Sequence, residues 1–355
     1  MFSCNSAKRN DLGEGKTEDS QAKKARNATP PEDHAIWEVS PKPDLQKVRQ
    51  EAVWEVPPKR DPDHAPREGF AVAKYQKITP LAAALLDSYI NGYQRTTTLF
   101  FGRIVSNPDD LPAFAEPLGY NMTYNAMATG NGNALHRHNS VEIFVALDAP
   151  FEIAYGSQGQ FKAWLEPWDV VACPAEAIHS YKNMGADGGQ ILTYLCGKPA
   201  IQWAPGVVEQ ARKNGAECDD TGILMKKGTV GAKIRALQGV QADELILEDG
   251  ALNKFVYRYV DREKRSLKVS SSAGIMRVLW EDLAPGCPYI PEGEDDTLVV
   301  VLKGTVECQG QSFTNLDVLK QPNFLVAGAE GATLLVTRSS LPHNLGFYFD
   351  ADITV

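Results

Sequence analysis

The chain has 355 residues, of which 43% are hydrophobic and 23% charged, and its formal net charge is −9. An acidic chain lacks the basic face that nucleic acid or an anionic membrane requires, so we expect neither as a partner. No run approaches 18 apolar residues, which argues against a membrane span. Six scattered cysteines without a Cys-x-x-Cys pair indicate reduced thiols in a cytoplasmic protein.

Residues 1–68 have the composition of a disordered or extended tail. Basic residues such as Lys23 leave organellar targeting open as an alternative to the cytoplasm, while acidic ones such as Glu18 count against a transit peptide. A Trp-Glu-Val-x-Pro pattern occurs twice, beginning at Trp37 and at Trp54. Exposed tryptophans are seldom left free, so we expect this repeat to dock on the body of the protein or on another protein.

The next part of the chain predicts strands with a few short helices. Thr79 and Pro80 are typical of a helix N-cap and first position, and Gly92 is a suitable stop. β-Branched and aromatic residues in alternation indicate strands. The predicted elements are a helix over 79–90, strands over 96–105, 120–128 and 191–195, and a helix over 205–214 that closes the domain.

Three of the six histidines fall within residues 130–183, together with a carboxylate. On an extended strand His136 and His138 point to the same side, and Glu142 keeps that parity. If the sheet closes on itself, His179 returns opposite them. Three imidazoles and a carboxylate suit a divalent transition metal such as Fe(II), Mn, Co, Ni, Cu or Zn. Fe(II) is favoured only together with the dioxygenase function considered below. Such a set fills four of six octahedral positions and leaves two open, which a catalytic site needs.

These residues resemble the motifs of the cupins. The family's first motif, Gly-x5-His-x-His-x3–4-Glu, is matched by Gly130, His136, His138 and Glu142. The second, Pro-x4-His-x3-Asn, is matched by Pro174, His179 and Asn183. Three glycines that the family usually has are replaced here, near Ala149 and at Trp168 and Glu176, which affects the shape of turns more than the ligands.

The resemblance implies an all-β chain of double-stranded β-helix, or jelly-roll, barrels, with His136, His138, Glu142 and His179 as metal ligands. The alternative is a cupin barrel that keeps its histidines without using them. A lone His-x-His is a weak signal, and the joint spacing of four ligands favours the metal site.

The second half repeats the first in a degenerate form. Asp169 and Pro174 recur as Asp317 and Pro322, each displaced by 148 residues, which indicates duplication. Matching the first motif places Glu292 and Glu294 at the two His positions, Leu298 at the Glu and Ala327 at the last His, so we expect no metal there. His343 is expected in a surface turn.

The predicted domains are a tail over 1–68, a metal-binding cupin over 69–215, a linker with flanking strands over 216–268 and a degenerate cupin over 269–355.

Aromatic residues of matching parity are expected to line the pocket beside the metal. Apolar walls suit a planar or moderately apolar small-molecule substrate, although each ring could also simply fill the barrel. The candidates are Tyr124, Phe144, Tyr181 and Trp203, followed by Met122 and Tyr194.

Three functions remain open from the sequence. In the favoured one, the chain resembles bicupins of the quercetin dioxygenase type, with dioxygen as co-substrate and Glu142 as ligand and proton acceptor. In the second, the metal is a Lewis acid and Tyr124 or Tyr181 is the base of a lyase or isomerase. In the third, the barrel binds a small molecule without turnover. The substrate, the metal and the oligomeric state, for which a homodimer is one candidate, cannot be read from the residues.

Overall fold

The structure is a computed structural model, and it describes residues 70–102, 112–114, 118–197, 200–224, 244–262, 266–271, 274–291, 296–342 and 352–354. Contacts divide the chain into residues 1–53 and 54–355, and all described residues belong to the second unit. The tail with its tryptophan repeat lies outside the described residues, as do Glu292, Glu294 and His343.

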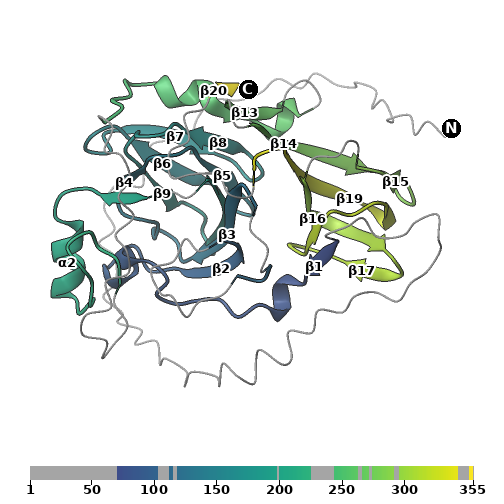
Figure 1. Cartoon of the computed structure of the whole chain (residues 1–355), viewed down its shortest axis with the longest axis horizontal. Coiled ribbons are helices and arrows are strands. Elements are labelled where there is room, and N and C mark those ends of the chain that lie inside the picture. The colour runs from purple at the N-terminus through teal and green to yellow at the C-terminus, as the bar shows by residue number, and fades with distance from the viewer. Residues whose placement is uncertain are drawn as a thin grey trace, which may run out of the picture. The chain divides into compact units, whose positions relative to one another are not determined.

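Two antiparallel sheets face each other in the N-terminal barrel (Figure 1). The six-stranded sheet has the order β12 (Val256–Tyr257), β8 (Val170–Cys173), β5 (Glu142–Ala146), β10 (Gly189–Cys196), β3 (Tyr120–Met127) and β2 (Thr96–Phe101). The five-stranded sheet has the order β11 (Ile201–Trp203), β4 (His136–His138), β9 (His179–Asn183), β6 (Phe151–Tyr155) and β7 (Phe161–Leu165).

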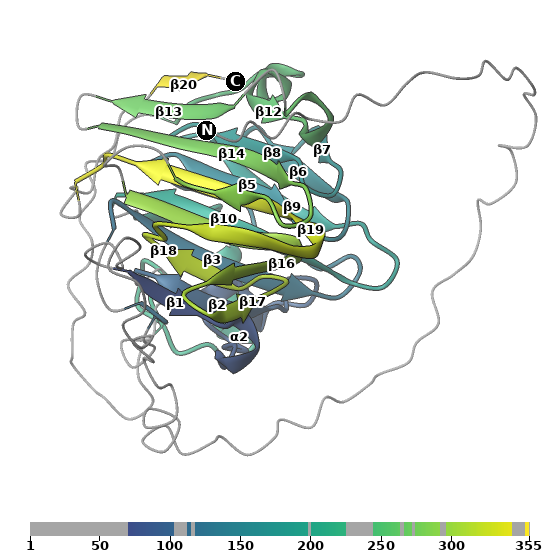
Figure 2. The same ribbon diagram turned by 90° about the vertical axis from the view of Figure 1, so that its right-hand side faces the viewer.

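One nine-stranded antiparallel sheet forms the C-terminal barrel, and its strands follow one another from β20 and β13 to β1 in Figure 2. Its main path is β1 (Ala71–Ala73), β18 (Val318–Lys320), β16 (Asp296–Cys308), β19 (Leu325–Ser339), β14 (Gly274–Leu283), β13 (Leu267–Ser271) and β20 (Asp352–Thr354). Off this path, β15 (Pro288–Tyr289) pairs with β19 and β17 (Gln311–Phe313) pairs with β16. The prediction of an all-β fold with a few short helices is confirmed for the described residues.

Helical structure is short in the described residues. The predicted closing helix is confirmed as α2 (Val207–Lys213). The predicted helix over 79–90 is wrong except for a 3-10 turn, η3 (Leu86–Tyr89). Leu81 exchanges both backbone hydrogen bonds with Thr97, at 2.8 and 2.9 Å, so its backbone is held as a strand partner. The other 3-10 turns are η2 (Tyr75–Lys77), η4 (Ala251–Phe255) and η5 (Tyr259–Asp261).

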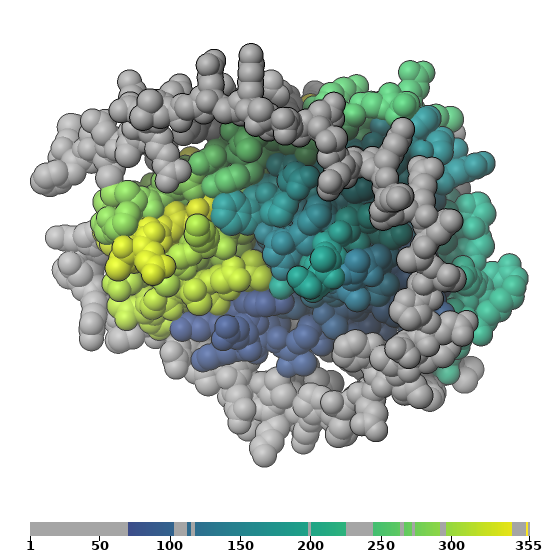
Figure 3. All heavy atoms as spheres, turned by 180° about the vertical axis from the view of Figure 1, so that it is seen from behind, coloured from purple at the N-terminus to yellow at the C-terminus, as the bar shows by residue number. Residues whose placement is uncertain are grey.

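Each half sends a short arm onto the sheet of the other half. Strand β1 pairs with β18 of the C-terminal barrel, while β12 pairs with β8 of the N-terminal barrel. After β1 the Tyr75 N–H donates to Asp317 at 2.9 Å, and after β12 the Tyr259 N–H donates to Asp169 at 2.9 Å. In the space-filling view the purple segment that holds β1 lies against yellow-green atoms (Figure 3). The two halves are therefore interlocked.

The duplicated turns are the same in both barrels. Trp168 and Leu316 each have a left-handed backbone, with φ of 74° and 65°. The Trp168 N–H donates to Ala146 at 2.6 Å, and the Leu316 N–H donates to Val301 at 2.7 Å. This conformation costs a non-glycine residue roughly 1–2 kcal/mol, which explains the glycine that cupins usually have there. The chain keeps the turn although it lacks the glycine.

Three apolar clusters hold the barrels together. One lies where the two halves meet and includes Ile143 and Val145 of β5 together with Val300 of β16. A second lies within the N-terminal barrel around Phe144. A third lies within the C-terminal barrel around Leu334. Because β5 is buried on both sides, alternate residues of this strand belong to different clusters.

Among the described residues, four cysteines are free and one is disulfide-bonded. Cys173, Cys196, Cys218 and Cys308 are free and buried. Cys287 is disulfide-bonded, so the expectation of reduced thiols is corrected there. No helix among the described residues is long and apolar enough to cross a membrane.

Candidate metal centre

Three short strands bring three histidines and one glutamate together inside the N-terminal barrel. His136 and His138 lie at the two ends of β4, and Glu142 begins β5. Strand β4 pairs with β9 so that His136 stands directly opposite His179. All four side chains are nearly fully buried, with at most 4% of any residue exposed. The local chain thus carries ligands from both sheets to one point.

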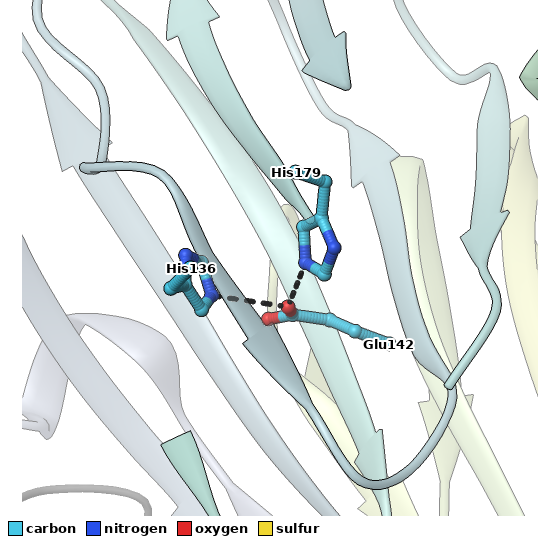
Figure 4. A group of neighbouring side chains, drawn as sticks. All are labelled: His136, Glu142 and His179. Carbon is cyan, nitrogen blue, oxygen red and sulfur yellow. Dashed lines mark hydrogen bonds and ion pairs between the residues drawn. The ribbon is translucent and has the colours of Figure 1, made fainter. Parts of the chain in front are cut away.

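The ligand atoms converge on one carboxylate oxygen. The Nε2 atoms of His136, His138 and His179 lie 3.5, 3.3 and 2.7 Å from Oε2 of Glu142. Ligand atoms of His136, Glu142 and His179 all lie within 4.8 Å of one another, a group that could hold a metal ion. Figure 4 shows the two imidazoles pointing at the carboxylate. His138 approaches the same oxygen, with its ring 6.2 Å from that of His179.

Backbone carbonyls fix the orientation and tautomer of each imidazole. Nδ1 of His136 donates to Ala134 at 2.8 Å, that of His138 to Ala200 at 2.9 Å, and that of His179 to Ala177 at 2.8 Å. A carbonyl only accepts, so the hydrogen of a neutral ring is on Nδ1. Each Nε2 then presents a lone pair to the Glu142 carboxylate.

Three lone pairs facing a carboxylate repel one another unless a cation lies between them. Burial lowers the pKa of His136 to about 4, although its hydrogen bond to Glu142 opposes this shift. His136 is therefore neutral near pH 7. Burial alone would raise the pKa of Glu142, but the charge of His138 and hydrogen bonds donated by the three imidazoles lower it well below its usual range. These effects require hydrogens on Nε2, and a metal ion bound to the three Nε2 atoms would supply the positive charge in their place. A neutral imidazole beside an ionised carboxylate fits a metal ion better than bound protons.

A buried ion pair supports the segment just before the metal ligands. Asp87 in η3 accepts two hydrogen bonds from Arg95, at 2.9 and 3.1 Å, and a third from the Ala134 N–H at 2.8 Å. Arg95 also donates to the Gly132 carbonyl at 3.2 Å. Since the Ala134 carbonyl in turn accepts from His136, the pair positions this ligand through the backbone of a single residue, Ala134.

Three of the expected aromatic residues lie at the centre. The ring of Phe144 is 5.6 Å from that of His179 and 5.3 Å from that of Tyr181, and the ring of Trp203 is 5.5 Å from that of His136. Burial raises the pKa of Tyr181, an effect that Arg95 partly opposes. The hydroxyl of Tyr181 is therefore protonated near neutral pH and is a hydrogen-bond donor.

The other residues expected to line the pocket, two tyrosines and a methionine, lie between the two halves of the chain. Tyr124, Met122 and Tyr194 belong to the cluster between the two halves, and the Tyr124 hydroxyl donates to the Leu316 carbonyl at 3.3 Å. Strand β3 is buried on both sides, so alternation in the sequence does not identify its inner face. The expectation that Tyr124 lines the pocket as a base is corrected on this geometry.

Sequence reasoning missed the residues that support the ligands. Asp87 was assigned only to a helix, and Arg95 was not singled out. Their spacing of eight residues carries no motif, and only the fold brings the acid, the base and Ala134 together.

The C-terminal barrel places other residues at the corresponding positions. In the N-terminal barrel, Glu142 pairs with Cys173. The residue that corresponds to Cys173 in the C-terminal barrel, 148 positions later, is Gln321. Its N–H donates to the Thr297 carbonyl. Thr297 therefore stands where Glu142 does, which corrects the expected Leu298. Ala327 pairs with Val306 in the C-terminal barrel, and His179 pairs with Tyr155 in the N-terminal barrel. Ala327 therefore stands at the position of His179, as expected from the sequence. That this barrel binds no metal stays a prediction.

No protein-family model matches the sequence, and no curated protein matches it. Solved structures do match. An 11S globulin from Wrightia tinctoria has 12% identity and a TM-score of 0.45, covering 78% of this chain and 85% of its own. A bacterial pirin from Escherichia coli in complex with nickel(II) has 11% identity and a TM-score of 0.44, with coverage of 77% and 99%.

A salicylate 1,2-dioxygenase from Pseudaminobacter salicylatoxidans is also similar, with 11% identity, a TM-score of 0.43 and coverage of 84% and 94%. All three are cupin-fold proteins. The assignment of the fold itself rests on the strand order and register described above.

Proposed function

We propose that this protein is a metal-dependent enzyme that acts on a small organic molecule, with one divalent transition metal held by His136, His138, Glu142 and His179. The observation that carries the proposal is the convergence of three Nε2 atoms on one carboxylate oxygen while each Nδ1 donates to a carbonyl. This arrangement prepares four lone pairs for one cation. Four protein ligands leave two octahedral positions for exchange.

The reaction that we favour is a dioxygenation. Bound Fe(II) would supply redox chemistry and two exchangeable positions for substrate and dioxygen. Phe144 and Trp203 would form apolar walls that exclude water from a planar substrate. Glu142 has a second carboxylate oxygen that can accept a proton as the substrate binds. The Tyr181 hydroxyl would donate a hydrogen bond to an oxygen of the substrate.

A redox-neutral lyase or isomerase is the second candidate, and Tyr181 is the observation in its favour. Its hydroxyl is protonated and lies in the field of Arg95 and Glu142. In that reaction Tyr181 would deliver a proton to the substrate, while Glu142 receives one. The metal would serve only as a Lewis acid.

Elemental analysis of full-length protein purified without added metal tests the metal proposal. We expect about one transition metal per chain, lost in His138→Ala. Arg137→Ala is the matched control, because Arg137 lies between the two histidines on β4 and donates to the surface residue Gln202. Equal metal content in His138→Ala and Arg137→Ala would contradict the proposal.

Oxygen uptake by Fe(II)-loaded protein with a panel of small organic acids separates the reactions. Uptake that requires both substrate and metal supports the dioxygenase. Turnover of the same acids without oxygen, lost in Tyr181→Phe, favours the redox-neutral enzyme. Binding without turnover in either condition would leave a ligand-binding protein.

A further inference from the structure

A second polar group lies inside the N-terminal barrel, on the sheet that carries Glu142. Its members are Thr97, Thr123, Asn125 and Thr193 on strands β2, β3 and β10. Thr193 pairs with Thr123 on one side and with Phe144 on the other, and Asn125 pairs with Thr97. Because paired residues share a face, the group faces the same interior as Phe144 and Glu142.

The group has more hydrogen-bond donors than it uses. The side chain of Asn125 contacts Thr97 at 2.8 Å and both Thr123 and Thr193 at 3.3 Å. These three contacts use three hydrogens, whereas three hydroxyls and one amide supply five. Two hydrogens therefore remain, and this count holds for either orientation of the amide. Among the described residues the group has no other side-chain partner.

Unused donors are costly in this place. None of the four residues is more than 4% exposed. Buried polar hydrogens in native proteins nearly always find an acceptor, and leaving one without an acceptor costs more than the bond is worth. A ligand with acceptor oxygens would satisfy both hydrogens. On the inner face of the C-terminal barrel, the described residues Val299, Val301 and Val336 are apolar, and the buried Thr297 lies on the same face.

We propose that this hydroxyl and amide group binds the carboxylate of a planar organic acid, which makes the acid the substrate class. The inference rests on the proposed function, because it takes the rest of the acid to lie toward the metal. Thr193 is two residues along β10 from Leu195, the partner of Glu142. Two residues on a strand span roughly 7 Å. Phe144 lies between, and its ring would cover one face of the acid.

Calorimetric titration of the metal-loaded full-length protein with benzoate tests the inference, with benzamide as the uncharged comparison. We expect benzoate to bind more tightly than benzamide. Thr193→Val and Thr123→Val each keep the shape and remove a donor, and should weaken benzoate by about 10-fold or more. Thr193→Ser keeps the hydroxyl and should keep the affinity.

The matched control is Thr98→Val. Thr98 is 2% exposed and neighbours Thr97 on β2, but it pairs with Tyr124 on the opposite face, so its variant should bind benzoate like the wild type. Metal content is measured for every variant and should not change. If the group holds only ordered water, the benzoate affinity will be unchanged in both valine variants. That result overturns the inference. So does absence of benzoate binding to the wild type. Absence of metal from the wild type instead refutes the proposed function.

Discussion

The two barrels share one backbone frame and differ in what fills it. Their turns at Trp168 and Leu316 have the same left-handed conformation and equivalent hydrogen bonds. The described C-terminal interior is mainly apolar, whereas the N-terminal interior has histidines, a carboxylate and a hydroxyl and amide group. Buried polar side chains lower stability unless they are paired. On the proposed function, the N-terminal barrel holds the reactive centre and the C-terminal barrel stabilises the fold around it.

Converting the N-terminal site to its C-terminal counterpart should have the largest effect. The double variant Glu142→Thr and His179→Ala introduces the residues found at Thr297 and Ala327. We expect metal affinity to fall by more than about 100-fold, since losing even an outer-sphere partner costs 10–100-fold. Competition with a chelator measures it. Retained affinity would mean that the metal, if any, is bound elsewhere.

Breaking the ion pair that supports the site should destabilise the N-terminal barrel. Asp87→Asn leaves Arg95 charged and buried, which costs about 3–5 kcal/mol of unfolding free energy. Urea unfolding measures it. The double variant Asp87→Leu and Arg95→Met removes both charges and should recover most of the loss. A cost for Asp87→Asn no larger than that of the double variant would contradict the assigned role of the pair.

Acid should destabilise the metal-free protein through His136. Its pKa is about 4 in the folded chain and near 6.5 when unfolded, so the unfolded chain binds more protons between these values. This contribution is fully present above pH 6.5 and is lost as the pH falls toward 4, by on the order of 3 kcal/mol. Urea unfolding of chelator-treated protein at several pH values measures it. The unfolding free energy of His136→Phe should depend less steeply on pH. An unchanged slope of unfolding free energy against pH would contradict the assigned contribution of His136.

Introducing a polar atom into the C-terminal core should give the smallest effect. Val336→Thr keeps the shape at a fully buried position and places a hydroxyl among aliphatic side chains, costing about 1–3 kcal/mol. Val326→Thr, on the same strand at a partly exposed position, is the control and should change little. Equal costs at the two positions would argue against a dry C-terminal interior.

The strand period of two predicted that His136, His138 and Glu142 share a face. The barrel fold and the place of His179 followed from the resemblance to the cupin motifs, and the 148-residue displacement indicated the duplication. The alternation of residues could not identify the inner face of β3, which is buried on both sides. The prediction that Tyr124 lines the pocket is therefore wrong. The alternation also could not find Asp87, which reaches the site only through tertiary folding. Long-range pairs without a local motif leave no trace in a single sequence.

X-ray absorption spectroscopy of the metal-loaded protein tests the central claim most directly. We expect a first shell of nitrogen and oxygen donors with the scattering of three imidazoles in the wild type. His138→Ala does not keep metal as purified, and we expect the scattering of two imidazoles when it is loaded at saturating metal. A shell that contains sulfur, or one that is the same in both proteins, would contradict a centre built from His136, His138, Glu142 and His179.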